Sequence, residues 1–248
     1  MFMSRRKRAA EMALEDHIQK VGTNRIEITN MTAFGAELTK ALSELFNIKG
    51  NYKIPILTEE EYAELEPDRC MYCLIRFTSC FDEDLKSVML VNTDKHNPCV
   101  YGEELTHGLV CNARPGTDLS VDEFFGFLGQ KATYKILRNY QPQLHLPSLN
   151  DIIDWFNRSK CKYERDEIYK IDLDRTTGGL VAGIAAPVAL EDKKLFSRSD
   201  EEIKHIYFEP VLNCDWPKYW EGKPDWWRLG EKCAEINREI KKRMQEAS

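Results

Sequence analysis

The sequence lacks an apolar run long enough to span a bilayer. The longest, residues 178–190, falls short of the roughly 20 residues that a transmembrane helix needs, and it contains Pro187. The N-terminus begins with a basic run, residues 5–8, but lacks the apolar core and the small-residue cleavage site of a signal peptide. We therefore expect a cytoplasmic protein with no membrane partner.

Cysteine is too sparse to provide a disulfide scaffold. Eight cysteines are spread over 248 residues, and the cytoplasm keeps thiols reduced. Cys70 and Cys73 form the one C-x-x-C motif, and no second pair exists to complete a four-thiolate zinc site. We expect structural thiols here, with a redox or metal role for this pair as the alternative.

The chain also lacks an excess of positive charge. Its 35 basic and 41 acidic residues give a net charge of -6, which argues against a broad nucleic-acid partner. There is no internal repeat or low-complexity tract, and the glycines at 178, 179 and 183 are not followed by the Lys-Ser/Thr of a phosphate-binding loop. We expect one globular domain over residues 1–248, and the alternative is a smaller C-terminal subdomain over about 150–248.

Hydrophobic periodicity predicts a mixed α+β fold. Extended segments are expected at residues 26–28, 54–57, 70–79, 87–92 and 169–173, with a loop at 81–84. Helices are expected at residues 9–21, from a Thr32 cap to 46, from Thr58 onward, and at 99–113, 121–140, 149–156, 199–205 and 228–246. Residues 178–190 are ambiguous between strand and helix.

The candidate chemistry is concentrated in the segment Glu103-Glu104-Leu105-Thr106-His107. On a helix, Glu103 and His107 are four residues apart and share a face, so both can bind one metal ion. Glu104 lies beside that face, where its carboxylate can accept a proton from a metal-bound water as a general base.

This segment resembles the H-E-x-x-H helix of zinc metallopeptidases, with Glu103 in place of the first histidine. The resemblance covers about 25 residues and is closest to the glutamate-zincin branch. It implies a third metal ligand, a glutamate, on the next helix, and Glu123 with Gly126 matches that element. It also implies that the strand at 87–92 lies along a substrate groove. Gly126 and Gly129 share a helical face and would let the two helices approach closely.

The resemblance implies a zincin-like central region at about residues 50–142. In it a mixed or antiparallel sheet packs on an active-site helix and a following ligand helix. The function it implies is metal-dependent hydrolysis of a peptide or amide bond, with metal ligands Glu103, His107 and Glu123 and the base Glu104. The cofactor would be Zn²⁺, although two carboxylates and one imidazole form a harder donor set that also suits Fe²⁺ or Mn²⁺.

Three other interpretations stay open. Glu103 and Glu104 could simply favour the N-terminal part of a charged helix, and Ser120 with Glu123 forms an S-x-x-E capping box that would explain Glu123 without a metal. A second E-x-x-H at Glu202 and His205 suggests a di-iron carboxylate protein as a further alternative.

A catalytically silent zincin-like interaction protein is the alternative from another functional class. Its contact surface would be residues 216–227, which contain Trp216, Trp220, Trp226 and Trp227, because protein interfaces are enriched in tryptophan. The same tryptophans could instead anchor a core.

Overall fold

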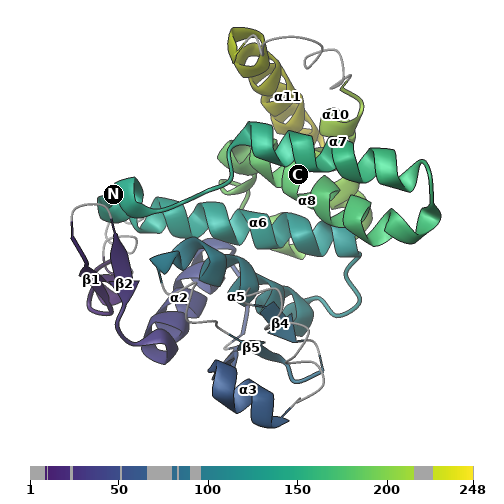
Figure 1. Ribbon diagram of the computed structural model, residues 1–248. Helices are drawn as coiled ribbons and strands as arrows, with labels where there is room; N and C mark the ends of the chain where they lie inside the picture. The colour runs from purple at the N-terminus through teal and green to yellow at the C-terminus, as the bar shows by residue number, and fades with distance from the viewer. Residues whose placement is uncertain are drawn as a thin grey trace. The chain divides into compact units, whose positions relative to one another are not determined.

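A computed structural model gives the fold of the chain. It describes residues 9, 11–22, 25–50, 52–65, 80–82, 84–89, 96–214 and 226–247. Within these ranges the protein is mixed α+β, with mostly helical structure and two small sheets (Figure 1). No helix in the described ranges is both long and apolar enough to cross a bilayer. The expected strand at 70–79 and most of the tryptophan-rich segment lie outside these ranges.

The chain forms two compact units. The first consists of residues 1–116 and 129–146, and the second of residues 117–128 and 147–248. One helix, α6 (Leu119–Ile136), runs without interruption and contributes residues to both.

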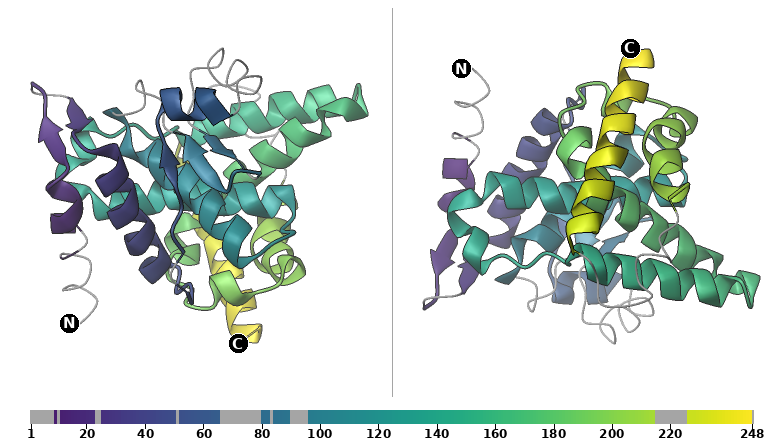
Figure 2. Two further views of the ribbon diagram at one scale, coloured as in Figure 1. Left: turned by 90° about the horizontal axis from the view of Figure 1, so that it is seen from below. Right: turned by 90° about the horizontal axis from the view of Figure 1, so that it is seen from above.

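The first unit contains both sheets. Besides the part of α6 that belongs to it, its elements are β1 (Ile18–Lys20), β2 (Ile26–Ile28), α2 (Met31–Leu45), β3 (Ile56–Leu57), α3 (Glu59–Leu65), β4 (Cys80–Asp82), β5 (Ser87–Met89), α5 (Pro98–Ala113) and a 3₁₀ helix (Arg138–Gln143). The second unit contains α7 (Leu149–Tyr163), α8 (Lys170–Ala189), α9 (Asp200–Ile203), a π-helix (Lys204–Phe208), α10 (Glu209–Leu212) and α11 (Trp226–Glu246), together with short 3₁₀ helices at Glu167–Tyr169 and Leu195–Ser197. Figure 2 shows α11 as the long yellow helix at the C-terminus.

The three-stranded sheet has the order β3-β5-β4 and is mixed. β5 pairs in parallel with β3 and antiparallel with β4, so both of its edges are occupied. An extended substrate needs a free strand edge, so it cannot pair with residues 87–89. The rest of the strand expected at 87–92 lies outside the described ranges, and its place along a substrate groove stays a prediction.

The expectation of a loop at 81–84 was wrong for its first two residues, and residue 83 lies outside the described ranges. Phe81 and Asp82 lie in β4. Asp82 Oδ1 accepts hydrogen bonds from the amides of Asp84 and Leu85 at 2.9 and 3.0 Å, and its Oδ2 accepts one from the Tyr62 hydroxyl at 2.7 Å. The aspartate therefore forms the turn by accepting hydrogen bonds from the backbone amides two and three residues further on, which composition alone does not reveal.

Capping side chains determine where helices α3 and α2 begin. Thr58 and Glu61 form the reciprocal side-chain bonds that start α3, as expected, at 3.2 and 2.8 Å. The cap of α2 is Asn30, whose side chain accepts from the Ala33 amide, and the expectation of a Thr32 cap was wrong. Residues 11–15 are helical, but the chain then turns and β1 pairs with β2, so the expected helix at 9–21 ends early.

The expected strand at 169–173 is instead the start of a helix. Residues Glu167–Tyr169 form a 3₁₀ turn capped by the Asp166 side chain, and α8 begins at Lys170. Lys170 pairs with Asp174 one turn later at 3.0 Å, which favours helix over strand. α8 continues through the ambiguous residues 178–189, and α7 is longer than expected because it ends at Tyr163.

The helix expected to end at 205 continues as a π-helix and then as α10. Pro210 explains the irregularity, since it has no amide to donate and its ring would clash with the carbonyl four residues earlier in a regular helix. In the first unit α6 ends at Ile136, where a 3₁₀ helix containing Pro142 replaces the expected continuation to 140.

Candidate metal centre

Helix α5 presents Glu103 and His107 on one half-buried face. The helix begins with Pro98 in its first turn, where a missing amide costs nothing, and ends at Ala113 before Gly116, which has a positive φ of 80°. These are the expected limits to within one residue. The spacing of four residues then places the two side chains one above the other.

Helix α5 packs closely against α6 through a reciprocal pair of glycines. A Cβ on Gly102 would lie 2.9 Å from the Gly129 carbonyl oxygen, and a Cβ on Gly129 would overlap the Gly102 carbonyl oxygen. Thr106 and Thr133, each one turn further along its helix, bond back to these same glycine carbonyls at 2.6 and 2.9 Å. The close approach expected at Gly129 is therefore confirmed, and it fixes the register of α6 on α5.

The start of α6 removes the capping-box explanation of Glu123. Asp118 precedes the helix, and its Oδ1 accepts from both the amide and the hydroxyl of Ser120, at 3.0 and 2.6 Å. Ser120 thus lies inside the helix and is not its cap. Burial raises the pKa of Asp118, but the bonds from Ser120 and Lys204 outweigh it and hold the pKa below its usual value.

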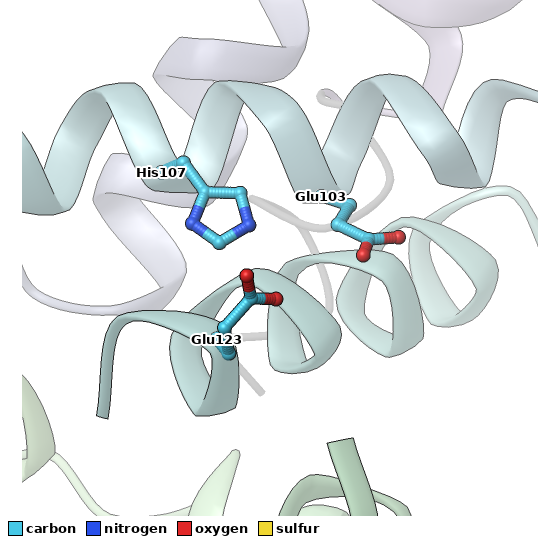
Figure 3. Close-up of side chains that lie close together, drawn as sticks. All are labelled: Glu103, His107 and Glu123. Atoms are coloured by element: carbon cyan, nitrogen blue, oxygen red, sulfur yellow. The ribbon is translucent and has the colours of Figure 1, made fainter. Parts of the chain in front are cut away.

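Glu103, His107 and Glu123 come together. One potential ligand atom from each lies within 4.8 Å of the others, and all three residues are half-buried. Figure 3 shows Glu103 and His107 pointing from α5 toward α6, and Glu123 pointing back toward them. In the part of the chain that the structure describes, this is the one such group of three or more potential ligands. Ligand bonds of about 2 Å place donor atoms at most about 4 Å apart, so modest side-chain rotations suffice to bind one ion.

Each carboxylate of this triad has a hydrogen-bond or ion-pair partner. Gln130 Nε2 donates to Glu103 Oε2 at 2.7 Å, and Arg175 Nε lies 3.3 Å from Glu123 Oε1. Gln130 is only 5% exposed, and its Oε1 is buried without a hydrogen-bond partner. Partners of this kind orient metal-binding carboxylates. The three donor atoms and the partners of the two carboxylates therefore fit the binding of a metal ion.

Sequence reasoning missed both supports. Gln130 follows Glu123 by seven residues, two helical turns, so its spacing could have revealed it. Arg175 could not have been found in this way, because its segment was expected to border a strand and its contact with α6 depends on tertiary packing.

Glu104 occupies the position of the expected base. It precedes Gly108 by four residues, and a Cβ on Gly108 would meet Ile54 Cγ2 at 3.1 Å and Phe81 Cε2 at 3.2 Å. Glu104 therefore lies on the side of α5 that faces the sheet, adjacent to the ligand face. Its side chain is half-buried.

Cys99 and His96, which precede Glu103 in the sequence, are poor ligands. Burial raises the pKa of Cys99 to about 12 despite the opposing charge of Lys131, so the thiol stays protonated at neutral pH. Burial also lowers the pKa of Lys131. His96 bonds the Ile26 carbonyl oxygen through Nδ1 at 2.7 Å, as a structural histidine would.

The second E-x-x-H motif has other roles. Glu202 completes a capping box with Ser199, and its carboxylate accepts from the Ser199 amide at 2.8 Å. His205 Nδ1 lies 3.1 Å from Glu209 Oε2. Neither side chain belongs to the group of potential ligands found in the described ranges.

Comparison of the chain with models of known protein families, with curated proteins and with solved structures finds no match.

Proposed function

We propose that this protein binds one divalent transition metal ion through Glu103, His107 and Glu123 and uses it to hydrolyse a peptide or amide bond. The observation that carries the proposal is the convergence of these three side chains from two consecutive helices to within 4.8 Å. The hydrogen bond from Gln130 to Glu103 also supports it. The same proposal includes a relationship to the glutamate-zincin branch, whose metal-binding helix the segment 103–107 resembles.

The donor set suits zinc and also accepts iron or manganese, because two carboxylates make the site harder than one with two histidines. A bound divalent ion would supply Lewis acidity and a more acidic water molecule. Glu104 would accept the proton from that water and pass it to the leaving nitrogen. A substrate would not pair with β5, since β3 and β4 occupy both edges of that strand.

The first test measures metal binding. The protein purified without chelator should contain close to one equivalent of zinc, iron or manganese by elemental analysis. Added metal should raise the thermal stability of the stripped protein, because a ligand that binds only the native state stabilises it. A stripped protein that gains no stability from any of the three metals contradicts the proposal.

The second test separates the base from the ligands. Glu104→Gln keeps the size of the side chain but cannot accept a proton, so hydrolysis should fall by about 100- to 10,000-fold while metal content stays at the wild-type value. Glu64→Gln, an exposed change on α3, is the matched control and should leave both unchanged. Equal activity in Glu104→Gln and wild type would rule out the role of Glu104.

A catalytically silent interaction protein is the second candidate. The ion pair between Arg175 and Glu123 favours it, because a cation of the chain itself already balances one carboxylate of the triad. The partner would be a cytoplasmic protein that binds residues 216–227. Absence of metal binding, together with capture of that partner through this segment, would support this candidate over the hydrolase.

A further inference from the structure

Arg175, on α8, places a cation beside Glu123 of the metal-binding triad. Arg175 Nε lies 3.3 Å from Glu123 Oε1, and the side chains are 52% and 14% exposed. We propose that Arg175, through its ion pair with Glu123, neutralises the extra negative charge that Glu103 introduces into the site, and so holds the metal affinity of the site below that of an unbalanced dicarboxylate. This inference rests on the proposed function and specifies which residue sets the metal affinity of the site.

The packing of α8 on α6 fixes the position of Arg175. A Cβ on Gly178 would lie 2.7 Å from both Glu123 Cβ and the Phe124 amide nitrogen, and would overlap the Ser120 carbonyl oxygen. Only glycine allows this approach. Arg175 precedes Gly178 by three residues and so lies on the same face of α8, next to Glu123. The ion pair therefore follows from how the helices pack.

The charge of the site explains why a cation belongs there. Two neutral histidines and one glutamate give a metal-binding set with one negative charge, whereas Glu103, His107 and Glu123 give two. The guanidinium of Arg175 restores a net charge of minus one without occupying a ligand position. An arginine suits this role because it stays protonated at all physiological pH values.

The consequence is a specific change in metal affinity. A positive charge near a divalent cation weakens its binding, and the effect at a partly exposed site is on the order of tenfold. If Arg175 acted only by orienting Glu123, its removal would weaken metal binding, since loss of such a partner typically costs about 10- to 100-fold. Removal of Arg175 therefore raises the metal affinity if its role is to balance charge, and lowers the metal affinity if its role is to orient Glu123.

The experiment compares the full-length wild type with Arg175→Met and Arg175→Lys. Zinc alone and manganese alone are titrated at neutral pH and low salt in competition with a chromophoric chelator. Arg175→Met should bind each metal about tenfold more tightly, by a similar factor for both, because a long-range charge effect does not depend on ligand softness. Arg175→Lys keeps the charge and should stay within about threefold of wild type. The gain in Arg175→Met should shrink at high salt, which screens charge.

Arg158→Met is the matched control. Arg158 pairs with Asp154 on the exposed surface of α7, so this variant removes the same charge without breaking the ion pair to Glu123 and should leave metal affinity unchanged. If wild type binds metal and Arg175→Met binds it equally or more weakly, the inference about Arg175 is overturned and the metal centre stands. If neither wild type nor Arg175→Met binds zinc or manganese, both are overturned. Circular dichroism melting verifies that each variant is folded.

Discussion

At the scale of single residues, the candidate site depends on side chains that bind no metal themselves. Glu103 is held by the amide of a buried glutamine and Glu123 by a half-exposed arginine. For Glu103, orientation before the ion arrives reduces the conformational entropy that is lost on binding it, whereas the charge of Arg175 beside Glu123 opposes the charge of the ion. The side-chain oxygen of Gln130 is buried and has no hydrogen-bond partner among the described residues.

Replacing Gln130 by Leu tests the support of Glu103. The change removes the donor to Glu103 and also the unsatisfied oxygen, so the free energy of unfolding of the metal-free protein should change by less than about 1 kcal/mol. Zinc affinity should fall by about tenfold or more, because Glu103 is no longer oriented. Isothermal titration with zinc and chemical denaturation measure the two quantities.

Gln141→Leu is the control for this change. The Gln141 amide donates to the Tyr134 carbonyl oxygen, not to a residue of the triad. The Gln141→Leu variant should therefore bind zinc with wild-type affinity. A Gln130→Leu protein with wild-type zinc affinity would show that Gln130 has no part in the site.

At the scale of secondary structure elements, the pairing of α5 with α6 determines whether the ligands meet. Gly102 and Gly129 let the two backbones approach, and Thr106 and Thr133 bond back to them. Because α6 is one continuous helix, the register fixed at Gly129 extends six residues back to Glu123. The geometry of the candidate centre is therefore a property of helix packing.

Gly129→Ala should disrupt this pairing. Its Cβ would overlap the Gly102 backbone oxygen, which has no rotamer by which to move away. We expect a loss of about 1–3 kcal/mol in the free energy of unfolding, typical of overpacked cores, together with weaker zinc binding.

Gly230→Ala is the counterpart on α11, where an added Cβ meets nothing within 4 Å. There alanine should stabilise the protein by about 0.5–1 kcal/mol through its higher helix propensity. Equal effects of the two substitutions in urea denaturation would contradict the packing argument.

At the scale of the whole molecule, a buried polar network joins residues 192–207 and, through the hydrogen bond from Arg198 Nη1 to the Ala247 carbonyl oxygen, reaches the C-terminal end of the second unit. Arg198 Nε lies 2.8 Å from Asp192 Oδ2, with side chains 4% and 6% exposed, and the Tyr207 hydroxyl donates to the same oxygen at 2.8 Å. Burial raises the pKa of Asp192, but the bonds from Arg198 and Tyr207 outweigh it and lower the pKa below its usual value. The charged carboxylate therefore stabilises the folded state.

Asp192→Asn should reduce the free energy of unfolding by about 3 kcal/mol at pH 7, since it leaves the buried Arg198 without a counter-charge. Because the folded-state pKa is depressed, this stability is present above the pKa of about 4 in the unfolded chain and is lost as pH falls through the folded-state value. The difference between wild type and Asp192→Asn should therefore narrow in acid. Urea denaturation from pH 7 down to pH 3 measures it, and a difference that does not depend on pH would contradict the role assigned to the carboxylate.

Local features of the sequence were sufficient for the helix at 99–113 and for the ligand pair on it. A spacing of four residues, a proline at the start and a Pro-Gly end are encoded within one segment, and no distant contact overrides them. The Thr58 cap and the C-terminal helix were found for the same reason. The Asp82 turn, the start of α8 at Lys170 and the position of β5 in the sheet were missed, because side-chain bonds and strand neighbours decide them.

The sequence by itself determined which residues share a helical face, and hence that Glu103 and His107 point the same way. Only the tertiary structure decided that Glu123 meets them and that Gln130 and Arg175 support the two carboxylates. The physical reason is that helical periodicity acts over four residues at fixed geometry. Contacts between helices instead depend on where the backbone can approach closely, here at Gly102, Gly129 and Gly178.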